Sequence, residues 1–224
     1  MVGHDQDLAS LGIRYESRGG DVWQPTPHGL FMAGILDRNH DLVAGLDVLE
    51  LGAGMAIHTI ILQRAGARSI TATEYREDLL QETRRLFEAH AEGACDIRYV
   101  VADWLDVDGT YDAVVTNPPF CKSGKTNRRY FIDELILNAH KRLRPRGRLI
   151  FVQSSMADIA KTQRRLDENG FDHEIIATTE GPFRDYYYEE PGFLEEARRV
   201  PGGFSMKDGK EHETLFVVSA RLRA

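Results

Sequence analysis

The sequence predicts an α/β fold in which helices cover both faces of a doubly wound, seven-stranded and mostly parallel sheet. Two observations predict it: strand-like and helix-like patterns alternate along the chain, and polar residues stand where four successive strands should end. A length of 224 residues suits one domain. Within it we expect a cover segment at 1–45, a core at 46–179, an insertion at 180–212 and an antiparallel last strand at 213–224.

The first half of the chain should supply four strands and two helices. A short apolar run at 48–51 ends in a glycine turn and predicts a buried strand, and a helix at 56–65 follows and stops at Gly66. Strands are expected at 69–73 and 97–102, on either side of a helix at 76–91 whose apolar residues recur on one face. A fourth strand at 111–116 ends before Pro118 and Pro119, because proline cannot continue a strand ladder.

The second half should add two helices and three strands. A helix at 129–143 is closed by Pro145 and Gly147, a strand follows at 148–153, and a helix at 158–168 is capped by Asn169 and Gly170. The last two strands are expected at 173–178 and 214–222. The long stretch between them is too aromatic for a plain linker, so we expect a small hairpin or lid that packs against something; its aromatic residues are Phe183, Tyr186, Tyr187, Tyr188, Phe193 and Phe204.

Charge and cysteine content narrow the class of protein. A net charge of −7 disfavours sequence-blind nucleic-acid binding, although the basic cluster Lys122, Lys125, Arg128 and Arg129 is weak evidence for an anionic partner. A second basic cluster, at 142–148, we interpret as structural, at the end of a helix where cations favour the macrodipole. Two cysteines without metal-ligand spacing predict no metal site and reduced thiols in a cytoplasm, and no apolar run is long enough for a membrane span.

A glycine turn after the first strand predicts a cofactor site. Glu50-Leu51-Gly52-Ala53-Gly54 lacks the third glycine of a dinucleotide fingerprint, because Ile57 stands there, so a pyrophosphate is disfavoured. An acidic residue before the turn suits a cationic ligand, and S-adenosylmethionine carries a sulfonium and an ammonium group. The cofactor-binding residues that we predict are Glu50, Gly52, Ala53, Gly54, Thr59, Glu74 for the ribose, Tyr75 beside the adenine, Asp103 for the adenine amino group, Trp104 and Asn117.

The motif Asn117-Pro118-Pro119-Phe120 is the most specific signal in the chain. A rigid proline pair presents a carbonyl and the Asn117 amide to the cleft, where both can accept hydrogen bonds from an NH₂ group. Accepting those hydrogens points the nitrogen lone pair at a methyl donor, and Phe120 offers a flat face to a planar acceptor. We therefore predict Asn117, Pro118, Pro119 and Phe120 as the catalytic residues.

The motifs together resemble the class I methyltransferases that methylate planar nitrogens. These include release-factor glutamine methyltransferases, adenine-amine DNA methyltransferases and small-domain RNA methyltransferases. The resemblance covers about 21–178 and resumes at 214, and both 21–25 and 212–215 are similar to the short protein-glutamine type. It implies a Rossmann-like fold, S-adenosylmethionine as cofactor and a target nitrogen held by residues 117–120. The chain departs from the bacterial release-factor enzymes in lacking their helical N-terminal domain, in having Phe120 where tyrosine is usual, and in its insertion.

Four functions remain open at this stage. The first is N-methylation of a small-molecule or amino-acid-like substrate, favoured by the acidic charge and the aromatic insertion. For it we predict these substrate-binding residues: Trp23, Pro25, His28, Phe120, Phe183, Tyr186, Tyr187 and Tyr188. The alternatives are a protein-glutamine methyltransferase, an RNA or DNA adenine methyltransferase, and a non-catalytic cofactor-binding assembly subunit. For His28 and His58, a packing or capping role is the favoured interpretation.

Overall fold

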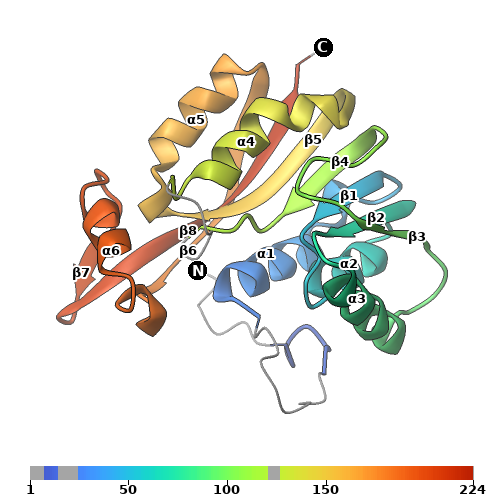
Figure 1. The fold of residues 1–224 in the computed structure, drawn as a ribbon, viewed down its shortest axis with the longest axis horizontal. Coiled ribbons are helices and arrows are strands. Elements are labelled where there is room, and N and C mark those ends of the chain that lie inside the picture. Colours follow the sequence, from blue (N-terminus) through green and yellow to red (C-terminus); the bar gives the residue numbers. More distant parts are fainter. Residues whose placement is uncertain (1–7, 15–24, 121–126, 224) are drawn as a thin grey trace.

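The sheet of the computed structural model has the predicted topology. The structure describes residues 8–14, 25–120 and 127–223, so the predictions for Trp23, Lys122 and Lys125 lie outside the described residues. Strand order is β3-β2-β1-β4-β5-β8-β6 (Figure 1). Neighbours among the first five strands pair in parallel, whereas β8 is antiparallel to both β5 and β6. This confirms the doubly wound α/β prediction.

The bounds of the elements agree closely with the sequence pattern in the first half of the chain. In order they are α1 (Pro27–Arg38), η1 (His40–Leu42), β1 (Asp47–Leu51), α2 (Ile57–Arg64), β2 (Ser69–Glu74), α3 (Glu77–His90), β3 (Asp96–Val101), β4 (Tyr111–Thr116), α4 (Tyr130–Asn138), η2 (Ala139–Lys141), β5 (Leu143–Ser154), η3 (Ser155–Ala157), α5 (Ile159–Glu168), β6 (Phe171–Pro182), η4 (Asp185–Tyr187), α6 (Pro191–Arg198), β7 (Ser205–Lys207) and β8 (Lys210–Leu222).

Two apolar layers enclose the sheet because successive strand residues point to opposite faces. Val48 packs with α1, α2 and α3 on one face, and its neighbour Leu49 packs with α4 and α5 on the other (Figure 1). Helix α1 lies across the first face, starting at Thr26, whose hydroxyl accepts a hydrogen bond from the Gly29 amide, and at Pro27, whose fixed φ suits the first helical position. The N-terminal segment thereby becomes part of the core.

The helix expected at 129–143 is shorter than predicted. Helix α4 ends at Asn138, a 3₁₀ turn follows, and β5 already begins at Leu143. Gly147 permits this irregular start, because a Cβ there would lie 2.9 Å from the Arg144 carbonyl oxygen. Of the basic residues at 142–148, Arg142 follows the 3₁₀ turn, but Arg144, Arg146 and Arg148 lie in β5 and not at a helix end. Arg144 is structural for another reason: it pairs with Asp47 and Asp112 at 2.8 Å each.

The insertion extends a long hairpin beyond the main sheet. Strands β6 and β8 pair as far as Pro182 and His212, so both exceed the expected bounds, and β7 adds a short eighth strand beside β8. Helix α6 and the turn η4 pack around their own apolar cluster, away from the main core (Figure 1). The cluster consists of Met156, Phe183, Tyr187, Phe193, Leu194 and Ala197.

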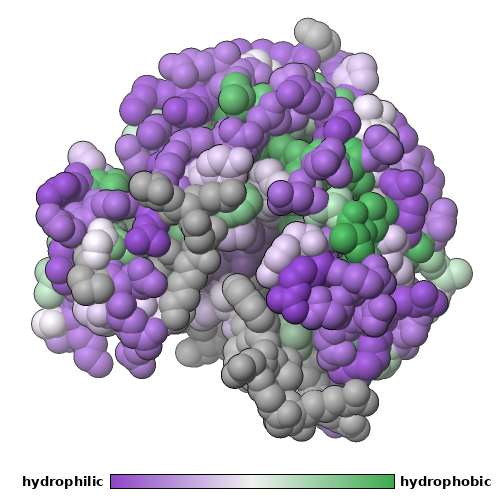
Figure 2. All heavy atoms as spheres, viewed as in Figure 1, coloured by the Kyte–Doolittle hydropathy of each residue, from purple (hydrophilic) through white to green (hydrophobic). Residues whose placement is uncertain are grey.

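The surface is predominantly polar on the face seen in Figure 2, where apolar side chains form only small patches between hydrophilic ones. Across the described ranges, no helix combines the length and apolar character needed to cross a membrane.

Candidate functional site

The predicted cofactor residues start at the carboxyl end of β1. Glu50 is fully buried, and its Oε2 accepts a 2.6 Å hydrogen bond from Thr59 Oγ1. Its Oε1 has no hydrogen-bond partner among the described residues and lies 3.8 Å from His58 Nδ1. Burial raises the pKa of Glu50 to about 8. Thr59 therefore orients this carboxyl group, and one carboxyl oxygen is left without a donor.

The glycine turn after β1 is fastened to the end of β2. Glu74 Oε1 accepts a 2.7 Å hydrogen bond from the Gly54 amide, and burial raises the pKa of Glu74. The amide of Ala53 donates to the Thr73 carbonyl at 3.0 Å. Gly52 has a φ of +70°, and a Cβ there would meet open space. The turn thus stays open on its outer side while its inner side is hydrogen-bonded.

The remaining predicted cofactor residues follow β2 and β3. Tyr75 is 61% exposed beside Glu74, so its ring is available to a ligand. Asp103 is also exposed. Trp104 has a φ of +52° and packs edge-on against Phe131, with ring centroids 4.9 Å apart; its buried Nε1 has no hydrogen-bond partner in the described part of the chain.

These residues fit S-adenosylmethionine. Glu50 offers an orphaned carboxyl oxygen to a cationic group, and the open turn at Gly52 admits a ligand close to the backbone. Glu74 and Asp103 place further carboxylates at the same edge of the sheet, where open α/β folds bind their ligands. Among the described residues, no group of three or more metal-type ligands occurs.

The predicted acceptor loop begins at the carboxyl end of β4, and the N-terminus of α1 orients it. Asn117 Nδ2 donates a 3.1 Å hydrogen bond to Thr26 Oγ1, the hydroxyl that also caps α1. A Cβ at Gly29 would lie 3.4 Å from the same nitrogen, so α1 approaches the loop closely. No described residue donates to Asn117 Oδ1, which leaves this oxygen as an acceptor. Pro118 is buried and Pro119 is exposed.

Two histidines close to the predicted site, His58 and His28, contact residues of other elements. His58 is buried and its Nε2 lies 2.9 Å from the Gly29 carbonyl oxygen, so it joins α2 to α1. His28 Nε2 lies 3.5 Å from Oε2 of Glu213, a fully buried carboxylate near the start of β8. Tyr187 donates its hydroxyl to the other oxygen of Glu213 at 2.9 Å. Glu213 thus joins the N-terminal helix to the insertion.

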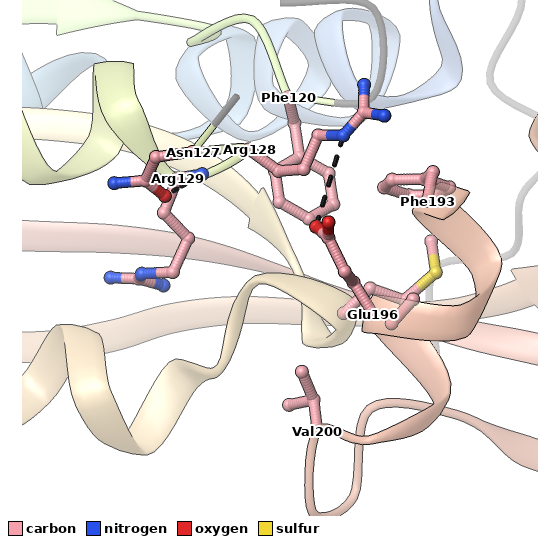
Figure 3. A pocket seen from close by; sticks show the side chains of 9 residues that line it. Phe120, Asn127, Arg128, Arg129, Phe193, Glu196 and Val200 are labelled. Atoms are coloured by element: carbon pink, nitrogen blue, oxygen red, sulfur yellow. Dashed lines mark hydrogen bonds and ion pairs between the residues drawn. The ribbon is translucent and has the colours of Figure 1, made fainter. Parts of the chain in front are cut away.

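Several of the aromatic residues predicted to bind the substrate pack against one another in the insertion. Phe183 and Tyr187 are buried in the cluster of the insertion, and Tyr188 donates its hydroxyl to Glu211 on the exposed side. A cavity of about 320 Å³ does lie beside the acceptor loop, but its aromatic walls are Phe120 and Phe193, with ring centroids 5.3 Å apart (Figure 3). Tyr186, Tyr187 and Tyr188 do not line this cavity.

Sequence reasoning missed three residues at this site. Thr26 before Pro27 is a recognisable helix-start signature and could have been found from the sequence. Phe193 could not be told apart from the other insertion aromatics, because its position depends on how α6 packs. Glu213 was noticed only as part of the motif at the chain end; no local pattern shows that a carboxylate in this strand is buried.

Residues 28–182 match the sequence model of the methyltransferase small domain family. A putative protein N5-glutamine methyltransferase of Methanocaldococcus jannaschii is 25% identical over 184 residues, which cover 74% of this chain and 88% of that protein. Ribosomal RNA small subunit methyltransferase C of Haemophilus influenzae is 29% identical over 167 residues, covering 70% of this chain and 48% of that protein, so the chain spans about half the length of this relative. A putative RNA methyltransferase of Pyrococcus horikoshii has the same fold with a TM-score of 0.67, 16% identity and full coverage of both chains.

Proposed function

Because this chain belongs to the methyltransferase small domain family, whose members use S-adenosylmethionine, we propose that it methylates a planar nitrogen of an amino-acid-like substrate. The favoured acceptor is a carboxamide of the kind found in a glutamine side chain. We propose that Asn117 and Pro118 hold the target nitrogen and that Phe120 packs against the planar group that carries it. Glu50, Gly52, Ala53, Gly54, Glu74, Tyr75, Asp103 and Trp104 are proposed to hold the cofactor, with Thr59 orienting Glu50.

The hydrogen bond from Asn117 Nδ2 to Thr26 is the observation that carries this proposal. It fixes the amide so that Oδ1 can accept an N–H of the substrate, while the Pro118 carbonyl can accept the second. With both hydrogens bound in one plane, the lone pair of the nitrogen points out of that plane toward the methyl donor. The nitrogen would form a bond to the methyl group as the bond from that methyl to the sulfonium sulfur breaks, and one proton would leave to water, so the acceptor NH₂ becomes NHCH₃. Positioning of this kind can lower a barrier by about 7–11 kcal/mol.

An amino-acid-like acceptor is favoured by length and charge. The relative named as a glutamine methyltransferase matches over most of its own length, whereas the ribosomal RNA relative matches over half. In the basic cluster, the Arg129 guanidinium forms hydrogen bonds inside the fold: it donates to Asp133 and Thr162 at 3.0 Å each. This removes part of the support for an anionic polymer as substrate.

A guanine or adenine amino group is the second candidate, favoured by the half-buried ring of Phe120 beside the cavity. An exocyclic amine on a base has the same planar NH₂ geometry as a carboxamide, so the acceptor loop by itself does not separate the two. The two acceptors differ in the group that carries the nitrogen. A base would stack on the face of the Phe120 ring, whereas an amide side chain would contact only the edge of that ring.

Methyl transfer from labelled S-adenosylmethionine tests the proposal directly. The wild-type protein and Asn117→Ala would be incubated with three separated fractions of a lysate: small molecules, proteins and RNA. We expect label in an amide-containing small molecule or protein and a loss of about 100-fold or more with Asn117→Ala, while calorimetry still detects cofactor binding. Label in RNA would favour the second candidate. Biological activity that survives Asn117→Ala without methyl transfer would show a non-catalytic assembly subunit instead.

A further inference from the structure

The cavity beside the acceptor loop combines apolar walls with one cation–anion pair. Phe120 and Phe193 meet edge-on in its lining, and the insertion also supplies Ala197 of α6 and Val200 beyond the end of that helix (Figure 3). Phe193 and Ala197 are almost fully buried in the cluster of the insertion, so this part of the lining is built before any ligand arrives. The volume of about 320 Å³ is sufficient for a group the size of an amino acid, and Phe120 of the acceptor loop is part of its lining.

Arg128 and Glu196 face each other across this cavity. Arg128 Nε lies 4.0 Å from an oxygen of Glu196, and its guanidinium carbon lies 5.9 Å from the centre of the Phe193 ring. A second carboxylate, that of Glu190, lies 3.6 Å from Arg128 Nη2. The Glu196 side chain is 56% exposed, and its separation from Arg128 is longer than a hydrogen bond. A ligand carboxylate that forms direct hydrogen bonds to the guanidinium would therefore be stronger than the Glu196 contact that it replaces.

The neighbouring Arg129 shows the contrast. It is buried, and its guanidinium is held by Asp133, by Thr162 and by the Asp158 carbonyl at 3.0–3.3 Å. Arg129 is held inside the fold by these contacts, whereas the partly exposed side chain of Arg128 lines the cavity, where it faces Glu196.

We propose that this cavity binds the carboxylate-bearing part of the methyl acceptor, with Arg128 as the residue that recognises the carboxylate and Glu196 as the group that the acceptor displaces. This inference rests on the proposed function and narrows it. An acceptor with a free carboxylate close to its target amide is a small amino-acid-like molecule, because a glutamine inside a protein has no α-carboxylate. The insertion thereby selects the acceptor, through α6.

Three probes of matched shape test the head group: benzoate, benzamide and phenyl phosphate. Each carries a planar ring of the same size that can lie against the apolar lining of the cavity, and each would be titrated calorimetrically into the protein saturated with S-adenosylhomocysteine. We expect saturable binding of benzoate and binding of benzamide weaker by about tenfold or more, because it lacks the charge that strengthens the hydrogen bonds. Tighter binding of phenyl phosphate than of benzoate would overturn the carboxylate assignment in favour of a phosphate.

Variants of the two charged residues make the test specific to the cavity. Arg128→Gln should weaken benzoate by about tenfold or more, Arg128→Lys should restore part of the loss, and Glu196→Gln should tighten benzoate several-fold because no internal carboxylate competes. Arg199→Gln is the matched control, since Arg199 pairs with Glu195 at the outer end of the same helix. Equal benzoate binding by wild type and Arg128→Gln would overturn the inference.

The failure of this inference and the failure of the proposed function would look different. If methyl transfer from labelled cofactor proceeds and depends on Asn117 while the affinity for benzoate is unchanged in Arg128→Gln, only the assignment of the carboxylate site fails. If methyl transfer to any acceptor is absent although the folded protein binds S-adenosylhomocysteine, the proposed function fails, whatever the cavity binds.

Discussion

At the scale of single residues, the Thr26 hydroxyl makes two contacts, and one substitution can remove the hydroxyl while keeping the size of the side chain. Its hydroxyl caps α1 and accepts the hydrogen bond that orients Asn117. Thr26→Val keeps the shape and removes both, so we expect a loss of about 1 kcal/mol in unfolding free energy and a lower kcat with little change in cofactor affinity. Denaturant unfolding and steady-state kinetics measure the two effects. Thr26→Ser retains the hydroxyl and should restore both; a serine variant as slow as the valine variant would contradict this role.

Glu50 links cofactor binding to pH. Burial raises its pKa to about 8, so at pH 7 the free protein holds a proton there. A cationic ligand against the carboxyl group would lower that pKa, and S-adenosylmethionine binding should then release up to about one proton. Affinity should rise with pH, by at most about tenfold per unit, and level off above pH 8. Calorimetry in buffers of different ionisation enthalpy measures the proton. Glu50→Gln should release none, whereas Glu88→Gln, on the exposed side of α3, should behave as wild type.

At the scale of elements, periodicity predicted what depends on local sequence. The glycine turn, the acidic residues at the carboxyl ends of β1 to β3 and the Asn-Pro-Pro-Phe loop all lie at one edge of the sheet, because the strand pattern of Val48 to Leu51 and of its neighbours already fixes direction and burial. Two things were out of reach. The start of β5 at Leu143 depends on tertiary ion pairs of Arg144, and the cavity wall depends on how α6 packs against Met156. Long-range contacts decide both, and no local pattern reports them.

The insertion depends on one buried carboxylate. Burial would raise the pKa of Glu213, but His28, Ser154 and the hydroxyl of Tyr187 together lower it. Tyr187→Phe removes one donor and should cost about 1–3 kcal/mol in unfolding free energy. Because the folded-state pKa lies below the usual glutamate pKa of 4.5, this stabilisation is present above that pH and is lost as acid protonates Glu213. Urea unfolding at neutral and acidic pH should show the difference shrinking.

Tyr188→Phe is the control for this prediction. Its hydroxyl donates to Glu211 at 3.1 Å, but its side chain is exposed, so the substitution should change the unfolding free energy by no more than about 0.5 kcal/mol. Equal costs for the two tyrosines, or a cost for Tyr187→Phe that does not depend on pH, would show that Glu213 does not anchor the insertion.

At the scale of the whole molecule, charge separates an amino-acid-like acceptor from a nucleic acid. The chain carries a net charge of −7, and many of its described arginines are committed to internal carboxylates; among them are Arg68, Arg129, Arg144 and Arg198. Sequence-blind RNA binding needs several cations free to displace counterions from phosphates. We therefore expect a short single-stranded RNA to bind more weakly than about 100 µM at physiological salt.

Fluorescence anisotropy of the labelled RNA, repeated over a range of salt concentrations, measures both affinity and the number of phosphates contacted. An acidic surface should give a logarithmic salt slope close to zero, with and without S-adenosylhomocysteine. Micromolar binding with a steep negative slope would mean that a cationic path across the molecule exists after all. The ribosomal RNA relatives would then be the better guide to the acceptor, and Arg128 would be reassigned from a carboxylate of a small substrate to a phosphate of a large one.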